Sequence, residues 1–197
     1  MSANSTRIAV VYHSGYGHTK VLAEAVARGA QSVAGTDVAL IPVAEAEARA
    51  AEIDAADAII FGAPTYMGSV SAPFKAFMDA SSRTWFQQGW KNKIAAGFTN
   101  SASQSGDKLN SLMQLAIFAM QHGMVWVGLD LLPGNNSSKG SVDDLNRLGS
   151  FIGAMAQSNS DAQPDQAPIE SDRRTAEHLG RRVAGFASRI TAQPQAA

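Results

Sequence analysis

Tyr12-His13-Ser14-Gly15-Tyr16-Gly17-His18-Thr19-Lys20 is the stretch that decides the fold of this chain. It lies between the apolar run Ile8–Val11 and a helical pattern that begins near Thr19. Its two glycines allow backbone turns that direct N–H groups inward, its hydroxyls can hydrogen bond to an anion, and the following helix presents the positive end of its dipole. The order strand, loop, helix therefore predicts a phosphate-binding loop.

Two better-known glycine-rich loops do not fit this stretch. The Walker pattern needs a second Gly followed by Lys and Ser or Thr, and the dinucleotide fingerprint needs a third Gly where this chain has Lys20. The dinucleotide fold also requires an acidic residue after the second strand, whereas the candidate strand Asp37–Val43 ends in Ile-Pro-Val. A short loop lined by hydroxyls suits one monophosphate. A turn followed by an N-cap has the same residue types, so the loop alone leaves both interpretations open.

The composition narrows the class of protein. With 197 residues, 45% of them apolar, the chain can bury one sizeable core, and we expect residues 1–197 to form a single domain. A formal net charge of −1 argues against nucleic-acid and anionic-membrane partners. No apolar run reaches the ~18 residues of a membrane span, and no signal-peptide pattern opens the chain, so we expect a cytoplasmic protein. Because Cys is absent, we expect no thiolate metal site, and redox chemistry would need a bound cofactor.

Apolar strands alternate with amphipathic helices along the chain. The expected strands are Arg7–His13, Asp37–Val43, Asp57–Gly62, Lys93–Thr99 and Met124–Asp130. Helical spacing follows each of the first four, and a last helix begins at Ser171. This alternation predicts a doubly wound α/β fold with a core at about residues 7–191, in which a five-stranded parallel sheet carries helices on both faces. Ligands of such sheets lie at the carboxyl ends of the strands.

Three loops are expected to meet at those carboxyl ends: the phosphate loop, Pro64–Gly68 and Thr99–Gly106. A plain Pro/Gly turn would also account for the second of them. The segment 131–170, between the fifth strand and the last helix, shows little apolar periodicity. A connection of this length inside a compact domain predicts a lid or an arm that contacts a neighbouring subunit.

Four motifs follow one another in the chain: YHSGYGHTK at 12–20, FGAPTYMGSVSAPFKAFMD at 61–79, TNSASQSGD at 99–107 and QHGM at 121–124. In this order they resemble the WrbA-like NAD(P)H:quinone oxidoreductases of the flavodoxin superfamily. The resemblance covers about residues 7–190 and implies the strand order 2-1-3-4-5, one FMN per chain and a homotetramer. Many members carry an insertion between the second and third strands, where the segment 44–55 of this chain is short.

The resemblance also implies the residues of the site. Those expected to bind FMN are Ser14, Gly15, Tyr16, Gly17, His18, Thr19, Pro64, Thr65, Tyr66, Met67, Gly68, Thr99, Asn100, Ser101, Ala102, Ser103, Gln104 and His122. Tyr16, Tyr66 and Trp85 would bound the substrate pocket. His122 would be the catalytic residue, hydrogen bonding or donating a proton to the quinone oxygen. Without the resemblance, a His before Gly is equally a helix C-terminus, and a lone Trp is equally packing.

Three functions are consistent with these residues. The favoured one is FMN-dependent transfer of two electrons from NAD(P)H to quinones by a ping-pong mechanism; the others are a flavodoxin-type one-electron carrier and a flavin-binding regulatory protein without turnover. Carriers that meet redox proteins tend to be strongly acidic, unlike this chain. The loops Pro64–Gly68 and Thr99–Gly106 also contain no Asp or Glu. Because a carboxylate near the ring would disfavour an anionic reduced flavin, the sequence favours the enzyme.

Overall fold

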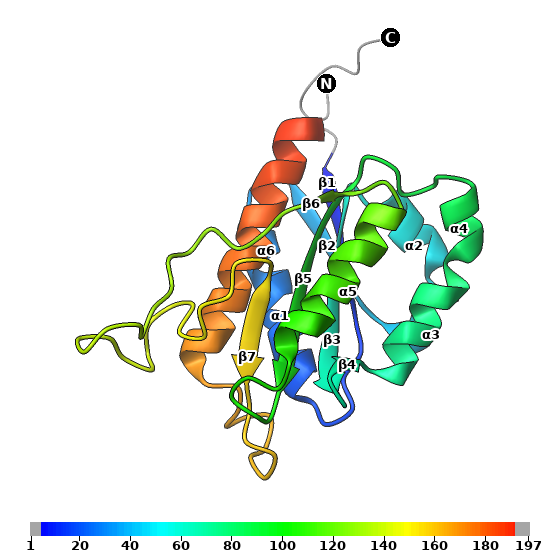
Figure 1. Cartoon of the computed structure of the whole chain (residues 1–197). Coiled ribbons are helices and arrows are strands. Elements are labelled where there is room, and N and C mark those ends of the chain that lie inside the picture. Colours follow the sequence, from blue (N-terminus) through cyan, green and yellow to red (C-terminus); the bar gives the residue numbers. More distant parts are fainter. Residues whose placement is uncertain (1–4, 192–197) are drawn as a thin grey trace.

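The structure is a computed structural model that describes residues 5–191. One seven-stranded sheet organises it, with the order β2-β1-β3-β5-β6, β4 antiparallel to β3, and β7 parallel to β5 (Figure 1). The strands are β1 Thr6–Tyr12, β2 Thr36–Pro42, β3 Ala58–Tyr66, β4 Ser69–Val70, β5 Ile94–Ser101, β6 Val125–Trp126 and β7 Ala154–Gln157. The predicted doubly wound fold and its flavodoxin-like order are confirmed, whereas the predicted count of five strands is too low because β4 and β7 were not foreseen.

Helices cover both faces of the sheet. They are α1 His18–Gln31, α2 Ala50–Ala55, α3 Ala72–Ala80, α4 Ser82–Phe86, α5 Lys108–Gln121 and α6 Glu170–Thr191, with a short 3-10 helix, η1, at Val43–Glu45. The apolar sides of α1 and α6 pack on one face, and those of α2, α3 and α5 on the other (Figure 1). The central strands are therefore buried on both sides, which explains why β1 and β3 are continuous apolar runs rather than alternating ones.

The fifth strand differs from the prediction of Met124–Asp130. β6 pairs with the start of β5 through only Val125 and Trp126, and the chain then leaves the sheet. It returns at β7, which pairs with the end of β5. The returning chain blocks a longer β6, because the Leu129 N–H donates to the Phe151 carbonyl at 2.7 Å. Two short strands, β6 and β7, thus pair with β5 where a single long strand was predicted.

Residues 127–153, here called the insert, form the excursion between β6 and β7. The segment 131–170, whose length predicts a lid or a subunit arm, contains β7, which completes the sheet. The role of the rest of the segment as a lid or an arm stays a prediction. A buried ion pair ties the insert to α6: Arg147 donates to both carboxylate oxygens of Asp172, at 2.8 and 2.7 Å. Asn146 reinforces this contact, since its backbone N–H donates to the Thr175 hydroxyl at 2.9 Å.

Two kinds of feature are absent from residues 5–191. No helix there combines the length and the apolar character needed to cross a membrane. No three His, Asp or Glu side chains gather there as the ligands of a metal ion would.

Candidate functional site

A cavity of about 670 Å³, here called the mouth, opens at the carboxyl ends of β1, β3 and β5. All three predicted loops contribute to it. The predicted residues that line it are Ser14, Tyr16, His18, Thr19, Pro64, Thr65, Tyr66, Met67, Gly68, Asn100, Ser101, Ala102 and Ser103. Its size lies within the range of pockets that enclose a cofactor or a small ligand.

The phosphate loop leaves the start of α1 free to bind an anion. Gly17, the N-cap, has a φ of 92°, and no side chain caps the helix. The Gly17 N–H donates instead to the Ser14 hydroxyl at 3.1 Å, which closes the loop on itself. No acidic residue lies in the first turn of α1, and the Thr19 side chain is buried against it. The unpaired N–H groups of that turn and the helix dipole suit a phosphate.

The segment after β7 holds this loop from outside. His18 Nε2 lies 2.8 Å from the Ala162 carbonyl and donates its proton to it. Pro164 lies so close to Gly17 that a Cβ there would come within 2.5 Å of its ring. The Nε2–H of His18 is therefore already hydrogen bonded within the protein. We expect His18 to contribute to binding by fixing the backbone conformation of the loop.

The β3–β4 hairpin supplies the second loop. Tyr66 pairs with Ser69, so Met67 and Gly68 form a two-residue turn with φ values of 50° and 76°. Positive φ at both positions is typical of a type I′ turn, which favours Asn or Gly over Met. Met67 is nevertheless present, with its side chain fully exposed at the mouth. Such a locally disfavoured residue at a cavity points to a role in binding.

A cluster of buried hydroxyls joins the second loop to the third. Thr65 Oγ1 lies 2.8 Å from Thr99 Oγ1 and donates to Ser111 Oγ at 2.7 Å. Thr99 is completely buried and does not line the mouth. Its hydrogen bond to Thr65 joins β5 to β3 below the cavity. Gln104 does not line the mouth either. Thr99 and Gln104 therefore lie outside the lining of the mouth, and their expected contact with the cofactor stays a prediction.

Four residues that line the mouth were not predicted: Gly106, Asp107, Ser158 and Ser160. Ser158 donates through its hydroxyl to Asn100 Oδ1 at 2.9 Å and through its backbone to the Ser101 carbonyl at 3.1 Å. It follows β7 directly, and only the pairing of β7 with β5 brings it to the mouth. No sequence pattern around it signals this position.

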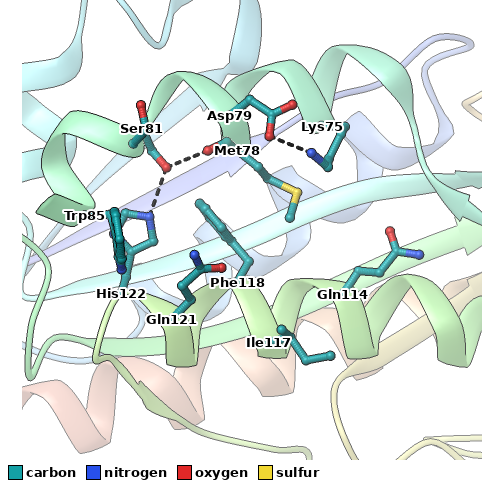
Figure 2. A pocket seen from close by; sticks show the side chains of 11 residues that line it. Lys75, Met78, Asp79, Ser81, Trp85, Gln114, Ile117, Phe118, Gln121 and His122 are labelled. Atoms are coloured by element: carbon teal, nitrogen blue, oxygen red, sulfur yellow. Dashed lines mark hydrogen bonds and ion pairs between the residues drawn. The ribbon is translucent and has the colours of Figure 1, made fainter.

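His122 and Trp85 do not reach the mouth within one chain. They line a separate cavity of about 450 Å³ between α3 and α5 (Figure 2). α5 begins at the mouth with Lys108 and ends just before His122. Its 14 residues, at 1.5 Å each, separate the two places by about 20 Å. Within one chain, Trp85 and His122 thus line a different cavity from Tyr66, and their expected roles at the flavin stay predictions.

The hydrogen bonds of His122 also assign its proton. The Ser81 hydroxyl donates to the Met78 carbonyl at 2.7 Å, so it can only accept from His122 Nε2, at 2.9 Å (Figure 2). Nδ1 then carries a bare lone pair, and it is buried without a partner among the described residues. Burial lowers the pKa of His122 to about 4. At neutral pH the imidazole is therefore uncharged, with Nε2–H donating to Ser81 and Nδ1 able to accept, and its expected hydrogen bond or proton transfer to the quinone stays a prediction.

The geometry of the mouth fits FMN. One phosphate matches the start of α1, and the exposed turn at Met67 and Gly68 can meet a flat ring. The rings of Tyr16 and Tyr66 stand edge to face at the entrance, with centroids 6.2 Å apart. Both rings offer apolar surface for stacking.

Known proteins give the same assignment. The family model described as NADPH-dependent FMN reductase matches residues 6–132. Flavodoxin FldP of Pseudomonas aeruginosa is 44% identical over 192 residues, covering 95% of this chain and all of that protein. An NAD(P)H dehydrogenase (quinone) of Archaeoglobus fulgidus is 33% identical over 207 residues, covering 93% and 98%. The crystal structure of a flavodoxin, WrbA-like protein from Agrobacterium tumefaciens has a TM-score of 0.73 at 44% identity, covering 94% and 99%. FMN is thus the cofactor of this chain, which belongs to the NADPH-dependent FMN reductase family as a WrbA-like member of the flavodoxin superfamily.

Proposed function

We propose that this protein is an FMN-dependent oxidoreductase that transfers two electrons from NAD(P)H to quinones. The observation that carries the proposal is the mouth, where the phosphate loop, the hairpin turn and the third loop converge on one cavity. Pro64–Gly68 and Thr99–Gly106 contain no carboxylate that would oppose negative charge on a reduced ring, and the one carboxylate among the residues that line the mouth, Asp107, is exposed and screened by water. Relatives with 30–33% identity, which carry the name NAD(P)H dehydrogenase (quinone), add support.

Each part of the mouth has a proposed role. The first turn of α1 and the Thr19 hydroxyl hold the phosphate, while the backbone of the Met67–Gly68 turn meets the polar edge of the ring. Tyr16 and Tyr66 guide the substrate ring onto the open side. Burial raises the pKa of Tyr66, which keeps its hydroxyl protonated and uncharged. Bound FMN would supply the chemistry by accepting a hydride and passing it on.

Because nicotinamide and quinone would stack at the same opening, they cannot bind together, and we propose a ping-pong mechanism. The test is steady-state kinetics with NADPH and benzoquinone, each varied against the other. Parallel double-reciprocal lines are expected. Intersecting lines would show that both substrates bind at once and would reject the single-opening mechanism. Anaerobic stopped-flow mixing with NADPH or NADH then checks that the flavin is bleached in the first half-reaction.

His122 and Trp85 would act on the flavin only from a neighbouring subunit, and α5 offers the surface for this. Leu109, Met113, Ile117 and Met120 form a stripe along α5, and each is 46–57% exposed. A two-fold contact that packs two such stripes antiparallel would bring the His122 end of one helix over the mouth end of the other. We propose this contact as one interface of a homotetramer, with the insert forming another. There, the bare Nδ1 of His122 would accept a hydrogen bond.

Ile117→Glu tests this interface, because a buried charge at the centre of the stripe would disrupt it. Light scattering should show a fall toward the 20.7 kDa of one chain. Ile190→Glu is the matched control, since Ile190 is also half exposed but lies near the end of α6. An unchanged mass for Ile117→Glu, or a monomeric unmodified protein, would reject the contact.

One observation favours a second candidate, a flavodoxin-type one-electron carrier: the name of the 44% identical relative from Pseudomonas aeruginosa. An anaerobic titration separates the two. A carrier would be reduced by dithionite in two separate one-electron steps and would not be bleached by NADPH or NADH. The proposed enzyme would be bleached by a reduced nicotinamide in one two-electron step.

A further inference from the structure

Lys108, the first residue of α5, is a buried cation next to the mouth. Its side chain is among the most deeply buried in the protein, with 1% relative exposure. Nζ donates three hydrogen bonds: to Ser101 Oγ at 2.8 Å, to the Ser103 carbonyl at 3.1 Å and to the Gln104 carbonyl at 2.8 Å. All three donors of the ammonium group are thus used to hold the third loop.

The positive charge of Lys108 has no counter-ion of its own. None of its three acceptors is charged, and the carboxylate that acts on it, Asp172, is already bound to both donor groups of Arg147. These three buried residues therefore carry one net positive charge. Asp107 adds a negative charge nearby, but its side chain is exposed and screened by water. Burial lowers the pKa of Lys108 to about 8, so the group is still mostly charged at pH 7.

This position works against local stability. A cation at the start of a helix opposes the helix dipole, and desolvation adds to the cost. A buried Met or Leu at this position would avoid both the unfavourable interaction with the helix dipole and the desolvation of a charge. Placements that break a local rule are expected where function requires them. Here the function is suggested by the acceptors, because Ser101 and Ser103 themselves line the mouth.

We propose that Lys108 has two linked roles toward FMN: it positions the third loop, and its fixed positive charge favours the reduced cofactor over the oxidised one. Reduction adds two electrons and one proton to the ring, which leaves one additional negative charge. A buried cation behind the loop stabilises that charge through a medium that screens weakly. The proposal goes beyond the choice of substrate, because it concerns the reduction equilibrium of the cofactor whichever acceptor follows.

The test compares Lys108→Met with Lys108→Arg, which keeps the charge. The dissociation constants of oxidised and of dithionite-reduced FMN are measured for each, together with the midpoint potential by dye equilibration. For Lys108→Met, reduced FMN should lose affinity on the order of tenfold more than oxidised FMN, and the potential should become more negative. Lys108→Arg should retain the ratio of the unmodified protein. Equal losses for both oxidation states in Lys108→Met would overturn the charge role.

A pH series keeps the test decisive if Lys108→Met does not fold. Between pH 7 and pH 10 the unmodified protein loses the charge on Lys108, whereas Lys108→Arg keeps its own. The midpoint potential of the unmodified protein should therefore fall below that of Lys108→Arg as the pH rises. Parallel curves over the whole range would overturn the proposal. Failure of the unmodified protein to bind FMN at all would instead reject the cofactor placement on which the inference rests.

Discussion

Burial determines the protonation state of His122. The imidazole lies in van der Waals contact with aromatic rings, 4.4 Å from the Trp90 centroid and 4.8 Å from that of Phe118. Little solvent remains to stabilise an imidazolium ion, which explains the low pKa. The nearest polar group, the Ser81 hydroxyl, accepts a proton that the neutral ring already carries. A charged His122 would add an N–H at Nδ1, which has no hydrogen-bond partner among the described residues.

This burial predicts a loss of stability in acid. The pKa of His122 falls from 6.5 to about 4 on folding, so the unfolded state binds the proton first. As the pH drops from about 6.5 to about 4, the free energy of unfolding should decrease by up to about 3 kcal/mol from this group. Urea denaturation at pH 7 and pH 4.5 measures it.

His122→Gln should remove this component, and its loss of stability between the two pH values should be smaller by that amount. His178→Gln serves as the control, because His178 lies near the surface on α6 and pairs with Asp130. If His122→Gln and the unmodified protein lose the same stability, His122 is already charged or accessible at pH 7.

At the scale of elements, α1 and α6 approach each other through two glycines. A Cβ on Gly29 would lie 1.8 Å from the Glu177 carbonyl oxygen, and one on Gly180 would lie 1.9 Å from the Val26 carbonyl oxygen. Backbone thus meets backbone at the crossing, and neither side has a flexible side chain that can move away. The packing of both helices on the sheet depends on these two positions.

Gly180→Ala should therefore destabilise the protein by more than about 3 kcal/mol, since overpacking against backbone forces the helices apart. Gly185→Ala is the matched control in the same helix, because nothing lies within 4 Å of a Cβ at that position. There the better helix propensity of Ala should stabilise by about 0.5–1 kcal/mol. Guanidinium denaturation of both variants checks this, and opposite signs are required.

Long buried strands were predictable from the sequence, and short ones were not. β1, β3 and β5 are covered by helices on both faces, and this burial requires continuous apolar runs, which are easy to recognise in the sequence. β7 consists of Ala-Met-Ala-Gln, which has no strand signal, and it forms because β5 has an unpaired half next to α6. The position of the mouth was also predictable, because ligands of such sheets lie at the carboxyl ends of the strands. The distance between His122 and the mouth depends on the direction of α5, which motif order alone does not reveal.

At the scale of the whole molecule, the pair Arg147–Asp172 joins the insert, β7 and α6. Asp172 also accepts from the Gln157 backbone N–H at 2.9 Å. Arg147→Met should cost about 3–5 kcal/mol, because it leaves a buried carboxylate without its main partner. The double variant Arg147→Met with Asp172→Asn should recover at least half of that loss. Thermal denaturation of Arg147→Met, Asp172→Asn and the double variant measures the coupling, and strict additivity of the two single losses would contradict a coupled pair.

Two short strands, β6 and β7, pair with the same side of β5, and this has a consequence for self-association. An exposed sheet edge is a template for another chain to join, and long flat edges favour aggregation. Here that edge offers a foreign strand only two residues of β6 and four of β7, separated by the whole insert. No continuous ladder can grow from it, so any assembly on this side must be made by side chains.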